Sequence, residues 1–249
     1  MAGHSKWANI KHRKAAQDAK KGKAFTKVAK EIAVAAKIGG GDPEMNPRLR
    51  LALDKARAVN LPKDNVDRAI KKGTGEGNDA IFEDVVYEGY GPGGVAILVK
   101  ALTDNKNRTV AEVRSTMSKK GGSMGEPGCV GWMFENKGLI EIEKAGISED
   151  QLMDLALEAG AEDVVDEGDV FQVVTDPSDY FDVKTALEEK GVAISFSELS
   201  MKPKNTVPVS VEDLKKIFSI TESLEDLDDV QEVYSNFEAD EAAMAELED

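Results

Sequence analysis

Two glycine-rich patterns in this chain match enzyme motifs, and each motif requires a definite structural context. Gly89, Gly91 and Gly94 satisfy G-x-G-x-x-G, the dinucleotide-binding pattern. That chemistry needs a helix N-terminus directly after the glycines, where it holds the pyrophosphate. Here a β-rich run follows, and Pro92 lies inside the pattern. We therefore predict a hairpin turn at this position.

The second pattern is Gly121-x-Ser123-x-Gly125, which matches the nucleophile elbow of serine hydrolases. An elbow needs a strand before the serine and a helix after it. In this chain a helical pattern precedes the serine and Pro127-Gly128 follows it. The context is therefore wrong for a hydrolase.

Few other side chains could perform chemistry. The only histidines are His4 and His12, which cannot complete a tetrahedral metal site by themselves and are poorly placed to act as a base. The single cysteine, Cys129, lies in an apolar run that indicates ordinary burial. No P-loop sequence is present. We expect no enzymatic activity, no catalytic residue, no metal, no cofactor and no small-molecule substrate.

Cationic side chains that could bind phosphates are concentrated at the beginning of the chain. Residues 1–72 contain 18 Lys and Arg against 7 Asp and Glu, whereas the other 177 residues contain 14 against 40. The whole chain has a net charge of −15, but affinity for polyanions depends on local groups of cations. We interpret residues 1–27, in which Asp18 is the only acid, as an arm that contacts phosphates.

Within this arm, Trp7 could stack on an unpaired base, and the histidines could donate to phosphates or bases. A second candidate is the loop KKGGSMGEPG, where Lys119 and Lys120 follow a helical pattern and could instead stabilise its dipole. The predicted nucleic-acid-binding residues are His4, Lys6, Trp7, Lys11, His12, Arg13, Lys14, Lys20, Lys21, Lys23, Lys27, Lys119 and Lys120. Further cations between residues 48 and 72 either extend this surface or form a solubilising helix face, since i,i+4 acids accompany them.

The elements that would position these residues change character along the chain. Up to residue 78 the apolar spacing is helical, with Asn46-Pro47 and Pro62 as helix starts, and Gly39–Gly41 and Gly73 as stops. Residues 82–90 and 95–102 then predict a hairpin, followed by a helix that ends before Gly121, and 129–135 predict a buried strand.

A β-α-β-β-α-β order follows over residues 138–203, with Ser148 and Gln151 as a capping box. This order is the ferredoxin-like pattern. The later strands and helix, over 206–238, are expected to return to the sheet begun at residue 82. The acids after residue 222 are interpreted as a solvated strand edge and end.

These patterns predict an α+β multidomain chain with an N-terminal helical bundle, a central α/β domain and a ferredoxin-like α+β domain inserted into the central one. The expected domains are residues 1–78 (arm and helical domain), 79–136 with 204–240 (α/β domain), 137–203 (ferredoxin-like domain) and 241–249 (acidic tail). The single cysteine and the absence of an apolar run of roughly 20 residues favour a cytoplasmic protein that does not bind membranes. We expect a monomer or weak dimer.

Four long segments of this chain resemble the YebC family, whose mitochondrial relatives include a translational activator of cytochrome oxidase subunit I. They are MAGHSKWANIKHRK (1–14), NPRLRLALDKARAVNLPKDNVDRAIKKGTGE (46–76), YEGYGPGGVAILVKALTDNKNRT (87–109) and GGSMGEPGCVGWMFENKG (121–138). The chain has Gly128-Cys129-Val130 where the family often has Gly-Ser-Val. The resemblance implies the same three-domain organisation and no enzymatic activity.

Two functions are compatible with that resemblance. Family members are labelled DNA-binding transcriptional regulators, and the partner would then be duplex DNA. The alternative is a ribosome-associated translation factor that binds ribosomal RNA near the tRNA region and relieves stalling at proline runs. The sequence shows no helix-turn-helix with a base-reading helix, and a basic arm with Trp7 suits irregular RNA somewhat better.

Overall fold

The computed structural model describes residues 18–75, 82–168 and 170–239, with side chains from residue 22 onward in the first range. These residues form two compact units. The first unit comprises the described residues of Ala8–Cys129 and Glu212–Ser235; the second comprises Val130–Val211 and the described residues from Asn236 onward. The expected α+β class, with helical, α/β and ferredoxin-like parts, is confirmed.

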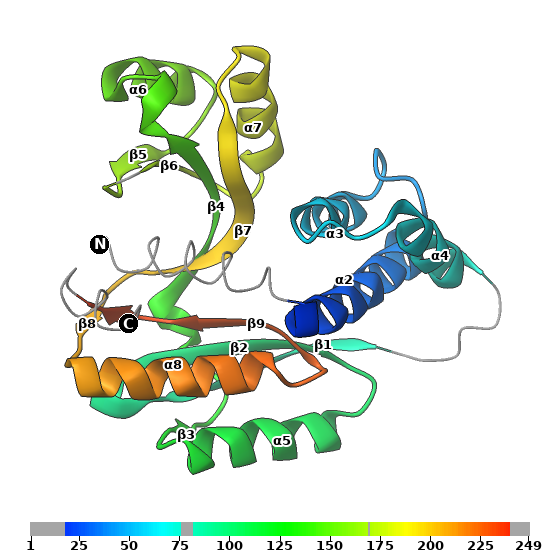
Figure 1. The fold of residues 1–249 in the computed structure, drawn as a ribbon, viewed down its shortest axis with the longest axis vertical. Coiled ribbons are helices and arrows are strands. Elements are labelled where there is room, and N and C mark those ends of the chain that lie inside the picture. The colour runs from blue at the N-terminus through cyan, green and yellow to red at the C-terminus, as the bar shows by residue number, and fades with distance from the viewer. Residues whose placement is uncertain (1–17, 76–81, 169, 240–249) are drawn as a thin grey trace. The chain divides into compact units, whose positions relative to one another are not determined.

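Three helices open the first unit: α2 (Asp18–Gly39), α3 (Pro47–Ala58) and α4 (Lys63–Thr74), drawn from blue to cyan in Figure 1. The predicted cap of α3 is confirmed, because the side chain of Asn46 accepts from the backbone N–H of Leu49 at 3.1 Å. The Asn46 side chain also donates to the carbonyl of Ala35, so the same residue holds α3 against α2.

Gly73 does not stop α4 as predicted, because the helix continues through it to Thr74. Gly73 is buried where α4 crosses α2. A Cβ at this position would overlap the carbonyl oxygen of Ala33 and would lie 2.8 Å from the Cβ of Ala36. The glycine therefore allows close packing of two helices.

We expect Gly73→Ala to destabilise the first unit by about 1–3 kcal/mol, because a backbone carbonyl cannot move aside for the methyl group. This penalty exceeds the gain in helix propensity, which is about 1 kcal/mol. Gly22→Ala is the matched control: Gly22 also lies within a helix and is exposed, and no atom lies within 4 Å of the position that its added methyl group would take. Urea unfolding should show Gly22→Ala as neutral or stabilising, and equal effects of the two variants would contradict the packing argument.

The sheet of the first unit has the strand order β3-β1-β2-β9. Strands β1 (Glu83–Tyr90) and β2 (Ala96–Thr103) form the predicted antiparallel hairpin around the short 3-10 turn Pro92–Gly94. Strand β3 (Ser123–Met124) pairs with β1, and β9 (Val230–Ser235) pairs antiparallel with β2. The expected return of the late chain to this sheet is therefore confirmed for β9.

Helices α5 (Lys106–Lys119) and α8 (Val211–Glu225) pack on one face of this sheet (Figure 1). Met117 of α5 and Ile220 of α8 join a core with the alternate β2 residues Ile97, Val99 and Ala101. Because side chains alternate along a strand, Lys100 belongs to the opposite face, together with Glu232 of β9. That opposite face receives the helical segment described below.

The second unit is the predicted ferredoxin-like arrangement. Its elements follow in the order β4 (Phe134–Glu143), α6 (Glu149–Glu158), β5 (Asp163–Asp166), β6 (Val170–Thr175), α7 (Tyr180–Glu189) and β7 (Ile194–Pro203). The strands pair antiparallel in the order β5-β6-β4-β7. The capping box of Ser148 and Gln151 is confirmed at the start of α6.

Two local predictions were wrong. Residues 129–135 do not form a strand: Gly131–Met133 make a 3-10 turn, and β4 begins only at Phe134. The side chain of Trp132 is accordingly 62% exposed, not buried. The run 206–210 contributes β8 (Val207–Pro208), which pairs with β10 (Phe237–Glu238) in a separate two-stranded sheet. The exact domain boundaries stay a prediction.

Candidate nucleic-acid interface

The predicted binding residues fall into three groups in the structure. Those from His4 to Lys14, including Lys6, Trp7, Lys11, His12 and Arg13, lie outside the described residues. Lys20 and Lys21 lie on α2, with only their backbone described. The structure describes the side chains of Lys23, Lys27, Lys119 and Lys120.

Lys23 and Lys27 are held by the carboxyl end of α8. The Lys23 ammonium donates to the carbonyl of Asp226 at 3.2 Å and lies 3.7 Å from the carboxylate of that residue. The Lys27 ammonium donates to the carbonyl of Glu225. The last carbonyls of a helix have no partner within the helix and carry partial negative charge, so they favour a cation. These two lysines are thus engaged within the protein.

Burial lowers the pKa of Lys27 to about 8, and the nearby acids Glu225 and Asp226 offset only part of this effect. A lysine in this environment is a weaker phosphate ligand than an exposed one near neutral pH. We therefore expect Lys27 to contribute little to binding of phosphates.

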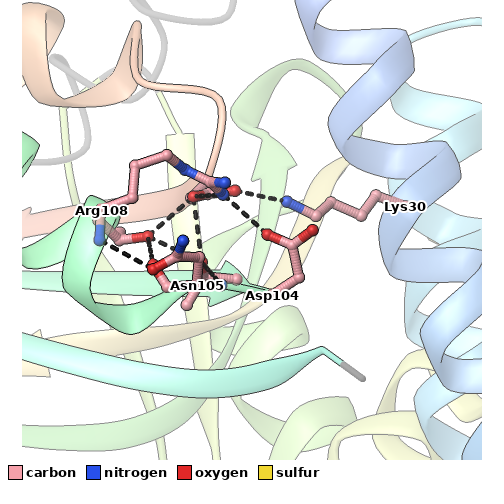
Figure 2. A network of polar contacts seen from close by, with 7 residues as sticks. Lys30, Asp104, Asn105 and Arg108 are labelled. Atoms are coloured by element: carbon pink, nitrogen blue, oxygen red, sulfur yellow. Dashed lines mark hydrogen bonds and ion pairs between the residues drawn. The ribbon is translucent and has the colours of Figure 1, made fainter. Parts of the chain in front are cut away.

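Asp229 is the centre of a second set of contacts. Figure 2 shows this network, with Lys30, Asp104, Asn105 and Arg108 labelled. The Asp229 carboxylate lies 2.8 Å from the ammonium of Lys30 on α2 and 2.5 Å from the guanidinium of Arg108 on α5. The buried hydroxyls of Thr103 and Thr109 donate to the same carboxylate at 3.1 and 2.8 Å. Asp229 is only 3% exposed, and both oxygens of its carboxylate accept hydrogen bonds, as buried polar groups require.

Burial alone would raise the pKa of Asp229, but hydrogen bonds from Lys30, Arg108 and Thr109 outweigh it and hold the pKa well below its usual range. The network also organises the start of α5. Asn105 caps this helix by accepting from the backbone of Arg108, and Asp104 accepts from the Arg108 guanidinium at 2.9 Å. In Figure 2, Lys30 reaches this cluster from α2. The carboxylate of Asp229 thus joins α2, β2 and α5.

A third contact involves Lys55 of α3, whose ammonium lies 3.1 Å from Glu31 and 2.5 Å from Glu232 of β9. Burial alone would lower the pKa of Lys55, but the two carboxylates raise it above its usual range. Burial likewise would raise the pKa of Glu232, but Lys55 and Lys100 lower it to about 2. Both groups are therefore charged at neutral pH.

We call the acceptors of these lysines the acidic seam. It consists of the backbone carbonyls of Glu225 and Asp226 and the carboxylates of Asp229 and Glu232. The prediction of a solvated acidic edge was wrong for Asp229 and Glu232, because their carboxylates bind the helical segment of the same unit. No local pattern could have revealed this, since the partners are about 180 to 200 residues apart in sequence.

Four cations of α4 are placed differently. Lys63, Arg68, Lys71 and Lys72 are exposed, and within the described ranges none of them forms an ion pair or a side-chain hydrogen bond. The sequence left open whether these residues extend the basic surface, and they were not among the predicted site residues. The helical period, with Ala69 and Gly73 as the buried face, would have placed Arg68 and Lys71 on the opposite side and Lys63 and Lys72 on the two flanks.

The second predicted region, after α5, keeps an exposed basic end. Lys119 and Lys120 are both exposed, and Lys120 donates to the hydroxyl of Ser219 at 3.1 Å. Gly121 and Gly128 have φ values of 90° and 87°, which L side chains rarely adopt. The thiol of Cys129 has a raised pKa because of burial and Glu88, so it is not an activated nucleophile.

Among the described residues, no group of three or more His, Cys, Asp or Glu is arranged to hold a metal ion. In the same part of the chain, no helix combines the length and apolarity needed to span a bilayer.

Comparison with known proteins accounts for nearly the whole chain. Residues 5–76 match the family described as "TACO1/YebC protein N-terminal domain", and residues 82–237 match "TACO1/YebC second and third domain". The chain belongs to the TACO1/YebC family. As a member of this family it is 56% identical to a probable transcriptional regulatory protein of Desulfotalea psychrophila, over 99% of each chain. A probable transcriptional regulatory protein of Maridesulfovibrio salexigens is 57% identical over the full length of both chains.

A solved structure has the same fold as this TACO1/YebC chain. The crystal structure of a conserved hypothetical protein, Aq1575, from Aquifex aeolicus matches with a TM-score of 0.79 and 47% identity, covering 90% of this chain and 93% of that one. The family is thus one of regulatory proteins by the names of its curated relatives.

Proposed function

We propose that this chain is a non-enzymatic, cytoplasmic regulator of gene expression that acts by binding nucleic acid through its basic N-terminal region. The observation that carries the proposal is the segregation of charge: 18 Lys and Arg against 7 Asp and Glu in residues 1–72, on a chain with net charge −15. Curated relatives named as probable transcriptional regulatory proteins support duplex DNA as the partner.

The contacts of the acidic seam change the salt dependence that we expect for this binding. Eight arm cations would give a salt slope of about −7 on duplex DNA, from about 0.9 per phosphate contact. Lys23 and Lys27 are bound to α8, which leaves Lys6, Lys11, Arg13, Lys14, Lys20 and Lys21. The arm should then contribute a slope of about −5.

The test is fluorescence anisotropy with labelled duplex DNA across a salt series, using a variant in which Lys11, Arg13 and Lys14 are replaced by Gln. Loss of three phosphate contacts should reduce the slope by about 3 and weaken binding at physiological salt. The control carries Lys190→Gln, Lys202→Gln and Lys215→Gln, which remove the same charge far from the arm in sequence. If the two triple variants bind alike, the arm is not the contact.

Ribosomal RNA is the alternative partner, and a translation factor the alternative function. It is favoured by Trp7 in the basic arm, which could stack on an unpaired base of irregular RNA. Sedimentation with ribosomes in the presence of excess duplex DNA separates the two. Arm-dependent binding that survives physiological salt and the competitor would favour the ribosome, and its loss would favour DNA.

A further inference from the structure

Helices α3 and α4 are connected in the manner of a helix-turn-helix. Only residues 59–62 separate them, and both helices pack on α2. Within this turn Asn60 has φ of 55°, and the buried side chain of Leu61 fixes the turn to the helical core. A turn of three or four residues between two such helices is the connection found in helix-turn-helix units, whose second helix contacts DNA. No such unit was predicted from the sequence.

The outward face of α4 is basic. The buried face holds Ala69 and Gly73, with Val66 and Ile70 packed against the helical core. The exposed cations are Lys63, Arg68, Lys71 and Lys72. By contrast, Lys30, Lys55 and Arg48 of α2 and α3 are bound to Asp229, Glu232 and Asp84.

A helix face of this kind could simply keep the protein soluble. Asp64 and Asp67 share the face, and Lys71 and Lys72 lie in the last turn, where cations stabilise the helix dipole. Yet neither acid forms an ion pair with the four cations, although each has one at i+4 spacing. Stabilisation of the helix dipole does not account for Lys63 or Arg68, because both lie in the N-terminal half of α4.

We infer that α4 presents this face to duplex DNA, with Lys63, Arg68, Lys71 and Lys72 on the phosphate backbone. From Lys63 to Lys72 the helix rises by about 14 Å. At 3.6 residues per turn, Lys63 and Lys72 lie on opposite flanks of the helix, with Arg68 and Lys71 between them, so the four cations would reach phosphates on both sides of a groove. The inference rests on the proposed function, and it adds a contact surface that is independent of the arm.

The test replaces Arg68, Lys71 and Lys72 by Gln in the full chain and measures binding to duplex DNA by anisotropy across a salt series. Gln has a helix propensity close to those of Lys and Arg, so α4 should remain helical, which circular dichroism checks. We expect a salt slope reduced by about 3 and binding at least about tenfold weaker at 0.15 M salt. The variant with Lys190, Lys202 and Lys215 replaced by Gln again serves as the charge-matched control.

The outcomes separate the two proposals. If the arm variant weakens DNA binding and the α4 variant behaves like its control, the inference about α4 is overturned while the proposed function stands. If the α4 variant loses affinity only for a structured RNA hairpin, the assignment to duplex DNA is overturned. If the unmodified protein binds neither nucleic acid, the proposed function fails and the α4 surface fails with it.

Discussion

Replacing Asp229 by Asn should lower the free energy of unfolding of the first unit by about 3 kcal/mol at neutral pH. The substitution keeps the shape of the side chain but leaves Lys30 and Arg108 without their shared carboxylate. It also turns one acceptor oxygen into a donor, next to the hydroxyls of Thr103 and Thr109. Removing one partner of a buried charge pair lowers the free energy of unfolding because the other charge is left without compensation.

The measurement is hydrogen exchange of the backbone amides of β2 and α5, which reports on this unit separately from the other one. Asp104→Asn is the matched control, since Asp104 also binds Arg108, at 2.9 Å, but its side chain is 45% exposed. An exposed pair contributes about 1 kcal/mol or less. If the amides exchange at equal rates in the two variants, burial of Asp229 adds nothing to the stability of this unit.

The same group makes a pH-dependent prediction. The pKa of Asp229 is depressed in the folded protein, so its stabilising contribution is fully present above its unfolded pKa of about 4 and is lost as the pH falls below that value. Acid unfolding of the unmodified protein should therefore be steeper below about pH 4 than that of the Asn variant.

Local signals in the sequence were sufficient for much of the fold. Asn46-Pro47 and Ser148 with Gln151 predicted helix starts that the structure confirms, because a cap involves residues three or four positions apart. The hairpin at 82–102 and the β-α-β-β-α-β order were recognised in the same way, from changes of apolar period and turn residues.

The failures have a different origin. Gly73 is a glycine because α2 passes close to it, and nothing in its own segment indicates this. Asp229 and Glu232 belong to an acidic run that looks solvated, but their partners Lys30 and Lys55 lie far away in sequence. The segment of Lys23 and Lys27 likewise does not show that the end of α8 binds them, and their role in nucleic-acid binding stays a prediction. Charge composition locates a basic region, whereas only packing decides which cations face outward.

The second unit contains one carboxyl group whose burial should make stability fall as the pH rises. Glu141 lies near the end of β4 and is only 3% exposed. Burial, together with the charges of Glu198 and Glu167, raises its pKa to about 7, although a hydrogen bond with Gln172 opposes the shift. The folded protein therefore holds a proton that the unfolded chain releases near pH 4.5.

Because the pKa is raised on folding, the contribution of Glu141 to stability is fully present below about pH 4.5 and is lost as the pH rises to about 7. The difference is on the order of 3 kcal/mol, at about 1.4 kcal/mol per pKa unit. Glu141→Gln removes the ionisation and keeps a partner for Gln172. We expect this variant to be more stable than the unmodified protein at pH 8, and similar to it at pH 4.5.

Hydrogen exchange of β4 and β6 amides between pH 4.5 and pH 8, corrected for the intrinsic pH dependence of exchange, measures this effect where it arises. Glu143→Gln is the control, because Glu143 lies two residues further on the same strand and is exposed. If both variants show the same dependence on pH as the unmodified protein, then Glu141 is ionised in the folded state at no cost. If only Glu141→Gln flattens the profile, the buried carboxyl is the group that makes the ferredoxin-like sheet less stable above neutral pH.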